Sequence, residues 1–346
     1  MRFALLVGLF AAGCYHPNPA TGSPCDDTAP CPSELACIAG TCQLSSLEDD
    51  AALADTRVLI DGCTPAPEIC GDGIDQDCDG SDPPCPSNDK AAGAIDISAG
   101  GTFTADVTFA TDDSSKATNG PAFCGGSGGR DVYYKIHLDA DEAVYLDTFG
   151  SSYDTVIRVF KGACFNGAVP PGALCHNDAC GTMQTQGVFD LVAGDHCVVV
   201  DQASAAVTSG ALTLHVERGR RSGLPISLGT PVTGNTTTGT DQSTGPCIAV
   251  AGPDLGYHFT ECPGGSDTFV ATTCNAVTDF DPVVYIRGPT GNLRCDDDDS
   301  NCSTGLGTTN ATTTSVTTGG PHIFWIIVDS GASGASGNFE LDTIVQ

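Results

Sequence analysis

The chain has 346 residues, with 43 acidic and 13 basic side chains and a formal net charge of −30. Because attraction to phosphate needs a basic surface, this charge argues against a nucleic-acid-binding protein. The length predicts about two domains, and the 19 cysteines indicate an oxidising compartment.

The first residues, 1–13, are typical of an export signal. Arg2 precedes a short apolar run that ends at Ala12, and this run is shorter than the roughly 20 residues that a bilayer-spanning helix needs. The small residues before Cys14 resemble a bacterial lipobox, although Ala11 stands where leucine is usual. We therefore expect lipidation of Cys14 and a lipid anchor at the outer membrane or cell surface of a Gram-negative-type envelope. The alternative is an ordinary signal peptide that is cleaved nearby.

Two small cysteine clusters follow a tether at residues 14–24 and are separated by a linker at residues 45–62. The first cluster, residues 25–44, spaces its cysteines more widely than the paired ligands of a zinc site, so two disulfides are the expected crosslinks. The second cluster, residues 63–86, combines four cysteines with a run of aspartates. Such short segments need crosslinks because they cannot bury enough apolar surface alone.

The strongest candidate site lies in the second cluster, where carboxylates alternate with glycines. Calcium takes oxygen ligands from flexible loops, and Asp75 to Gly80 has the D-x-D-x-D-G core of an EF-hand-like loop without its final glutamate. The segment resembles the MopE-type metal-binding motif of secreted bacterial proteins, a family labelled copper-binding. Because the donors are oxygens, we expect calcium, with copper as an open alternative and an ion-free acidic turn as another. The predicted ligands are Asp72, Asp75, Asp77, Asp79 and Asp82.

From about residue 94 onward, runs rich in valine, threonine and aromatic residues alternate with glycine and aspartate turns. Runs such as Val132 to Leu138 and Leu212 to Val216 alternate with period two, as half-buried strands do. The pattern predicts an all-β protein with two tandem sandwiches, at residues 94–218 and 224–346.

The two predicted sandwiches repeat one series of motifs. Tyr153-Asp154-Thr155 precedes an apolar strand, an acidic loop with cysteines and a strand that ends in aspartate. Phe280-Asp281-Pro282 opens the same series in the second half. A period this long indicates duplicated domains, because solenoid repeats run roughly 20 to 50 residues.

The first copy resembles the bacterial pre-peptidase C-terminal (PPC) domain. The residues that carry the resemblance are the strand Asp131 to Tyr134, the segment Tyr153 to Ile157 and the loop Cys175 to Cys180. The second copy is a weaker match, because Pro282 replaces the threonine that follows the aspartate. The resemblance implies a jelly-roll-like sandwich that accompanies secreted enzymes or surface proteins and is not itself catalytic.

An acidic loop beside cysteines in each copy is a second, weaker candidate for calcium. Adjacent aspartates repel one another unless a cation or solvent relieves them, so a solvated loop without an ion is the alternative. Asp279 or Asp281 could lie nearby, although Asp154 and Asp281 are better explained as residues that stabilise a turn. The predicted ligands are Asp178, Asp296, Asp297, Asp298 and Asp299.

Each sandwich contains five cysteines, an odd number that cannot pair completely within one copy. The short spacings predict the pairs Cys175–Cys180 and Cys295–Cys302, and Cys262–Cys274 could close a hairpin. The other partners stay open, and one bridge between the two sandwiches would satisfy both odd counts.

The sequence has no His-Glu-x-x-His zinc helix, no Gly-x-Ser-x-Gly elbow and no phosphate loop. It therefore predicts a non-enzymatic, surface-exposed, calcium-binding lipoprotein that acts as a binding or adhesion module. The partner is a glycan, a protein or a matrix ligand. One alternative is an accessory or targeting subunit for a secreted hydrolase, and another is a degradative enzyme without a recognisable motif.

Overall fold

In the computed structural model the chain forms two compact units, residues 1–62 and 63–346. The predicted signal segment, Cys14, Cys63 and the linker at 45–62 lie outside the described residues. Among the residues that are described, no helix has the length and hydrophobicity to cross a membrane. The structure describes residues 24–25, 31, 35–38, 40–43, 64–66, 68–115, 124, 128–204, 210–219, 223–247 and 252–346.

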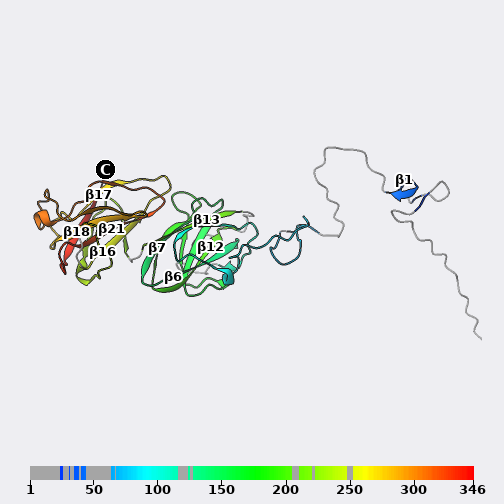
Figure 1. Ribbon diagram of the computed structural model, residues 1–346, viewed down its shortest axis with the longest axis horizontal. Coiled ribbons are helices and arrows are strands. Elements are labelled where there is room, and N and C mark those ends of the chain that lie inside the picture. The colour runs from blue at the N-terminus through cyan, green and yellow to red at the C-terminus, as the bar shows by residue number, and fades with distance from the viewer. Residues whose placement is uncertain are drawn as a thin grey trace, which may run out of the picture. The chain divides into compact units, whose positions relative to one another are not determined.

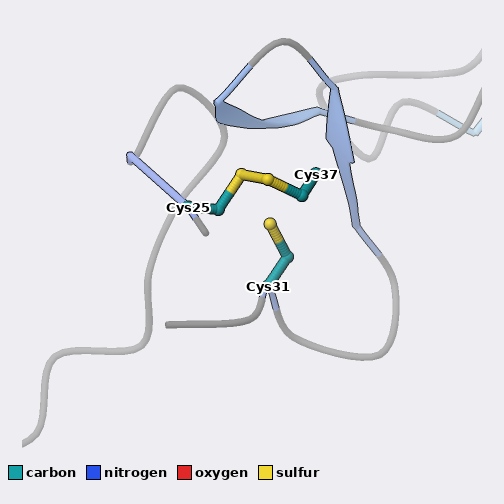
Figure 2. A group of neighbouring side chains, drawn as sticks. All are labelled: Cys25, Cys31 and Cys37. Carbon is teal, nitrogen blue, oxygen red and sulfur yellow. A yellow bond between two sulfur atoms is a disulfide. The ribbon is translucent and has the colours of Figure 1, made fainter. Parts of the chain in front are cut away.

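The described part of the first unit is a disulfide-linked hairpin of β1 (Ala36–Ile38) and β2 (Thr41–Gln43). The bridges are Cys25–Cys37 and Cys31–Cys42, and Figure 2 shows the first of them. A hairpin of this size buries little apolar surface, so the crosslinks stabilise it mainly by restricting the unfolded chain.

The first sandwich contains a five-stranded sheet of order β10-β8-β12-β6-β3 and a four-stranded sheet of order β11-β7-β13-β4 (Figure 1, cyan to green). The one-turn helix η1 (Ala91–Gly93) precedes it, and the connecting loops pair β5 (Ser114–Ser115) with β9 (Gly167–Ala168). The strands of the two sheets are β3 (Ile95–Asp96), β4 (Gly101–Asp106), β6 (Asp131–Leu138), β7 (Glu142–Asp147), β8 (Thr155–Lys161), β10 (Leu174–Asn177), β11 (Gln186–Leu191), β12 (Gly194–Gln202) and β13 (Ala211–Arg218).

The second sandwich contains a five-stranded sheet of order β14-β16-β21-β18-β19 and a four-stranded sheet of order β15-β22-β17-β20 (Figure 1, yellow to red). Two further one-turn helices, η2 (Thr236–Thr238) and η3 (Gly307–Thr309), lie in its loops. Its strands are β14 (Leu224–Pro225), β15 (Val232–Asn235), β16 (Leu255–Thr260), β17 (Thr268–Thr272), β18 (Pro282–Gly288), β19 (Gly291–Asp296), β20 (Val316–Thr317), β21 (Ile323–Ser330) and β22 (Asn338–Val345).

The two sandwiches have the same topology. The sheet β10-β8-β12-β6-β3 corresponds strand for strand, in chain order, to β19-β18-β21-β16-β14, and the four-stranded sheets correspond in the same way. The prediction of an all-β, jelly-roll-like pair of sandwiches after small disulfide-rich segments is confirmed. The repeated motifs therefore lie at equivalent places in two equivalent scaffolds.

Each sandwich buries an apolar core between its sheets, because alternate side chains of a strand face the same side. In the first copy Val132, Tyr134 and Ile136 of β6 lie in this core. In the second copy Val284 and Ile286 of β18 do so. The period-two runs of the sequence thus mark the inward faces.

A separate apolar cluster joins the outer faces of the two sandwiches, and we call it the seam. Ala143 and Tyr145 of β7 cluster there with Tyr285 of β18 and Trp325 of β21, all at most 5% exposed. Gly223 permits this contact, because a Cβ at that position would lie 2.4 Å from the Trp325 ring. Burial of several aromatic side chains favours a fixed arrangement of the two sandwiches.

A covalent bond and polar contacts reinforce the seam. Cys180 of the first sandwich is disulfide-bonded to Cys262 of the second. Gln186 donates a hydrogen bond from Nε2 to the carbonyl oxygen of Glu261 at 2.7 Å. The prediction of one bridge between the sandwiches is confirmed.

The three specific cysteine pairs predicted from short spacing, Cys175–Cys180, Cys295–Cys302 and Cys262–Cys274, are wrong. Cys175 lies opposite Arg158 in the β10–β8 register, and Cys124 lies on the same outer face, where its carbonyl oxygen accepts a hydrogen bond from Arg158. Cysteines that are close in sequence, such as Cys175 and Cys180, are therefore bonded to partners on different faces of the sandwich. The observed bridges of the two sandwiches are Cys124–Cys175, Cys164–Cys197, Cys180–Cys262, Cys247–Cys295 and Cys274–Cys302.

The outer face of the first five-stranded sheet buries a charged cluster. Arg158 and Asp201 form an ion pair with an Nη1–Oδ2 distance of 2.5 Å, and both side chains are completely inaccessible to solvent. Asp131, opposite Asp201 in the β12–β6 register, accepts hydrogen bonds from the amides of Asp113 and Ser114 at 2.9 and 2.8 Å. Burial nevertheless raises the pKa of Asp131 to about 7, and the negative charges of Asp113 and Asp112 add to the rise.

We expect the contribution of Asp131 to stability to fall as the pH rises from about 4 to about 7. The folded protein keeps the proton up to a pKa of about 7, whereas the unfolded chain releases it near the ordinary value of 3.8. Unfolding therefore releases a proton in this window, which lowers the free energy of unfolding by up to about 1.4 kcal/mol per pH unit. Thermal unfolding followed by circular dichroism in chelator, with Asp131→Asn beside the wild type, measures the effect. An equally steep slope in the variant would contradict the assignment.

Candidate metal sites

The first candidate site is the loop between Cys70 and Cys85, whose sulfurs form a disulfide. Three glycines of this loop, Gly71, Gly73 and Gly80, have positive φ angles of 67°, 81° and 98°. Glycine adopts these angles without steric cost, so the chain can turn sharply between the aspartates. The bridge and the turns together hold the carboxylates close to one another.

Three of the five predicted ligands close the loop instead of converging on a common point. Asp82 accepts hydrogen bonds from two amides across the loop, at 2.7 and 2.6 Å. Asp72 and Asp79 each accept a hydrogen bond at 2.9 Å from the amide two residues ahead. Carboxylates in these positions stabilise turns of the backbone.

Asp75 and Asp77 do converge, and Glu68 joins them. One oxygen of each side chain lies within 4.8 Å of the other two. This spacing suits a shared calcium ion, whose ligand oxygens lie about 2.3 to 2.6 Å away. Glu68 also accepts a hydrogen bond from the amide of Asp77 at 3.1 Å, so it reaches across the loop. The aspartate pattern did not reveal Glu68, and its position two residues before Cys70 was the available signal.

The four aspartates in the acidic loop of the second sandwich, Asp296 to Asp299, have two different roles. Asp296 accepts a hydrogen bond from the amide of Thr312, and Asp299 accepts one from the amide of Asn301, both at 2.8 Å. The Asn301 amide holds the pKa of the Asp299 carboxyl below its ordinary value. These two carboxylates therefore stabilise the backbone of the loop, and those of Asp297 and Asp298 between them remain available to bind an ion.

Asp297 and Asp298 converge with Asp281, which immediately precedes β18. One oxygen of each lies within 4.8 Å of the other two. The Oδ1 atoms of Asp281 and Asp297 are buried and accept no hydrogen bond from any described residue. Burial, and after it the charge of Asp298, raises the pKa of both carboxyls. Such oxygens carry a desolvation cost that a bound cation would offset.

Gly331 leaves room between these carboxylates. Its amide donates a hydrogen bond to the carbonyl oxygen of Asp281 at 2.8 Å, so the backbone passes directly beside the cluster. A Cβ at this position would lie 2.9 Å from the Oδ1 atoms of both Asp281 and Asp297. A larger residue would therefore occupy the space that an ion needs.

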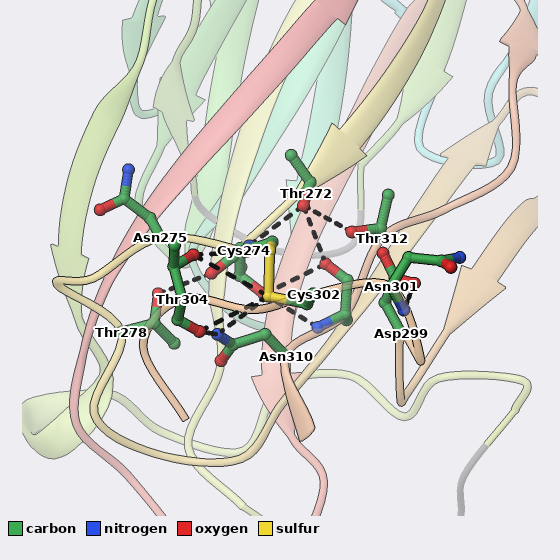
Figure 3. Close-up of a disulfide and its surroundings, with 12 residues drawn as sticks. Thr272, Cys274, Asn275, Thr278, Asp299, Asn301, Cys302, Thr304, Asn310 and Thr312 are labelled. Carbon is green, nitrogen blue, oxygen red and sulfur yellow. Dashed lines mark hydrogen bonds between the residues drawn. A yellow bond between two sulfur atoms is a disulfide. The ribbon is translucent and has the colours of Figure 1, made fainter. Parts of the chain in front are cut away.

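A disulfide and a group of hydroxyl hydrogen bonds anchor the far side of the acidic loop (Figure 3). Cys302 is bonded to Cys274, which follows β17. The hydroxyls of Thr272 and Thr312 lie 2.6 Å apart and are hydrogen-bonded to each other. The loop is therefore fixed to the sheet by contacts that involve none of the converging carboxylates.

The first sandwich has an equivalent cluster with one carboxylate fewer. Asp154 precedes β8 as its counterpart precedes β18, and Asn177 and Asp178 take the places of Asp297 and Asp298. The Oδ1 atoms of Asp154 and Asn177 are buried and accept no hydrogen bond from any described residue. Burial, with the charge of Asp178, raises the pKa of Asp154. Because calcium affinity depends on ligand charge, we expect this cluster to bind more weakly.

The suggestion that Asp279 or Asp281 lies near the acidic loop is confirmed for Asp281, whereas the preferred interpretation of Asp154 and Asp281 as turn residues did not anticipate these clusters. Each lies beside an acidic loop that is distant in sequence and adjacent in the sheet. The signal that could have revealed them is that both repeats keep an aspartate at this point while other residues of the motif differ.

A third group of possible ligands is excluded by its chemistry. The sulfurs of Cys25, Cys31 and Cys37 lie within 4.8 Å of one another (Figure 2). All three belong to disulfides and so lack the thiolates that zinc requires. The sequence-based preference for disulfides over zinc in this segment is confirmed.

Comparisons with known proteins do not identify a family. No family model matches the chain, and no curated protein matches it significantly. The tail fibre protein gp63.1 from a phage of E. coli is similar at a TM-score of 0.23 and 9% identity, over 70% of this chain and 38% of that protein. The CUB1-EGF-CUB2 domain of human MASP-1/3 is similar at a TM-score of 0.17 and 10% identity, over 70% of this chain and 99% of that one. The ANXUR2 extracellular domain from Arabidopsis thaliana is similar at a TM-score of 0.19 and 8% identity, over 70% of this chain and 89% of that one.

These similarities are too weak to carry an argument about function. The resemblances to the PPC domain and to the MopE-type motif stay predictions from the sequence.

Replacing both Asp281 and Asp297 with asparagine should reduce the rise in melting temperature that calcium produces. Asparagine keeps the size of the side chain and removes the charge that attracts the ion. Differential scanning calorimetry in chelator and then in calcium measures the rise. The matched control is Asp299→Asn in the same loop, which should lower the melting temperature without calcium and keep the calcium-dependent rise. Equal rises in the double variant and the wild type would exclude this cluster as a calcium site.

Glu68→Gln should remove one class of calcium sites from a calorimetric titration. The substitution takes away one of three converging carboxylates while its amide oxygen can still accept the loop hydrogen bond. Asp139→Asn, at a fully exposed position on the first sandwich, is the control and should titrate like the wild type. If Glu68→Gln also titrates like the wild type, this loop does not bind calcium.

Proposed function

We propose that this protein is a non-enzymatic, calcium-binding module for binding or adhesion. It is exported and held at the outer membrane or cell surface by a lipid on Cys14. One observation supports the calcium part most strongly: equivalent loops of both sandwiches place buried oxygens without hydrogen-bond donors beside further carboxylates. Calcium prefers such oxygen ligands and tolerates irregular geometry around them.

Calcium fits the three clusters better than copper does. Every converging donor in them is a carboxylate or amide oxygen, and no histidine belongs to any oxygen cluster among the described residues. Copper prefers imidazole and sulfur ligands, and the described sulfurs near the first loop form a disulfide. Copper stays an alternative because of the label of the MopE-type family, and competition between the two ions separates them.

The binding role follows from where the clusters lie. Two of the three clusters, at Asp154 and at Asp281, belong to loops at the ends of sandwich strands, and a rigid sandwich commonly presents such loops to a partner. The seam and the Cys180–Cys262 bridge hold the two sandwiches in one arrangement, so both loops keep fixed positions. Asp178 and Asp298 are exposed, so both loops carry negative charge at an accessible rim, where a bound calcium ion would lie. A glycan, a protein or a matrix ligand fits such a rim.

The proposal is tested on arrays of glycans and matrix proteins probed with the full chain in calcium and in chelator. We expect binding to one ligand class in calcium and its loss in chelator, because the ion orders the loops and supplies ligand contacts. The Asp281→Asn, Asp297→Asn double variant should bind less than the Asp299→Asn control. Mass spectrometry of the N-terminal peptide checks the lipid on Cys14.

Two other outcomes would redirect the proposal. A secreted hydrolase that co-purifies with the chain, and that is mislocalised without it, would favour the accessory role. Turnover of any arrayed ligand at enzymatic rates would overturn the non-enzymatic assignment.

A further inference from the structure

A small cavity at the edge of the seam contains two of the seven histidines of the chain. Its volume is about 260 Å³, and it lies between β13 with its neighbour β4 in the first sandwich and the residues before β21 in the second. His215 and Glu217 of β13 line it from one side, and Pro321 and His322 line it from the other. The two imidazoles therefore come from different sandwiches and share one cavity.

Each imidazole is oriented by a carboxylate at its Nδ1 atom. Nδ1 of His215 lies 2.8 Å from Oδ1 of Asp147, a buried residue whose same oxygen accepts the amide of Phe149 at 2.9 Å. Nδ1 of His322 contacts Oε1 of Glu217 across the seam. A carboxylate at Nδ1 fixes the neutral ring in the form that carries its proton there. This leaves Nε2 of both rings as a lone-pair donor.

The strand geometry places both histidines at the wall of the same cavity. His215 and Glu217 are alternate residues of one strand, so they point to the same face at a separation of about 7 Å. His322 is hydrogen-bonded to Glu217 and lines the same cavity as His215. Neither Nε2 atom is hydrogen-bonded to another described residue, and the side chains are 34% and 40% exposed.

We propose that His215 and His322 bind a zinc ion through their Nε2 atoms. Imidazole nitrogen is a preferred zinc ligand, and histidine ligands of metals almost always donate their other N–H to a carboxylate or carbonyl. The carboxylates of Asp147 and Glu217 accept that N–H hydrogen bond. Two protein ligands leave two positions of a tetrahedral ion for water or for a group from a partner.

This site is independent of the calcium clusters. It uses nitrogen donors where the clusters use oxygens, and none of its residues belongs to those clusters. A bound ion would add one more link between the two sandwiches, next to a seam that is already closed by apolar packing and a disulfide.

The experiment titrates zinc into the chelator-treated full chain in saturating calcium, which occupies the oxygen clusters, and follows binding by calorimetry. We expect one zinc per chain, with at least about a tenfold loss of affinity in His215→Ala and in His322→Ala. The matched control is His137→Ala. His137 also has a carboxylate at Nδ1, with Asp195 at 2.6 Å, but lies outside this cavity. The His137→Ala variant should bind zinc with the same affinity as the wild type.

Glu217→Gln is a further variant that keeps both histidine ligands. It should weaken zinc binding by about tenfold, because it removes the carboxylate that orients the His322 ring. X-ray absorption of the wild-type zinc complex gives a readout that does not depend on any variant folding, and it should show two imidazole ligands. Absence of zinc binding, or a spectrum with oxygen ligands alone, would overturn the proposal. So would equal affinity in the wild type and the His215→Ala, His322→Ala double variant, because the two rings would then be simple ion-pair partners.

Discussion

Carboxylates that repel one another stay within 4.8 Å only when other bonds hold the backbone that carries them. In this protein those bonds are disulfides and amide hydrogen bonds. Cys70–Cys85 closes the first loop, and Cys274–Cys302 anchors the acidic loop of the second sandwich. Because none of these bonds involves an ion, the oxygens are positioned before a cation binds. Prior positioning reduces the ordering cost of binding. In the acidic loop different aspartates serve the backbone and the cluster, whereas in the first loop Asp75 and Asp77 converge and also accept amide hydrogen bonds.

The duplicated scaffold uses one sheet face in two different ways. In the first sandwich this face carries Arg158, which is buried against Asp201. The equivalent position of the second sandwich is Tyr285, which is part of the seam. A buried guanidinium needs a carboxylate and a polar cover, whereas a tyrosine ring can be covered by apolar groups of another domain. This difference accounts for which sandwich presents the face to its neighbour.

Much of the fold could be predicted because its signals are local. Alternation along Val132 to Leu138 marked an inward face, and the odd number of cysteines in each half predicted a bridge between them. The candidate sites were predicted only in part. Asp75, Asp77, Asp297 and Asp298 converge as expected, but Glu68 and Asp281 join them from segments that the acidic runs do not include. Short spacing also failed for Cys175, since its partner, Cys124, is 51 residues away in the sequence.

The amino-acid sequence by itself determined that the chain has two all-β repeats, disulfide-closed segments and acidic loops. These properties depend on residue type, alternation and turn residues, which act over a few neighbouring positions. Only the tertiary structure decided which cysteines bond, which carboxylates meet and that His215 and His322 share a cavity. Those outcomes depend on which distant strands become neighbours and which faces pack together, and no local pattern specifies either.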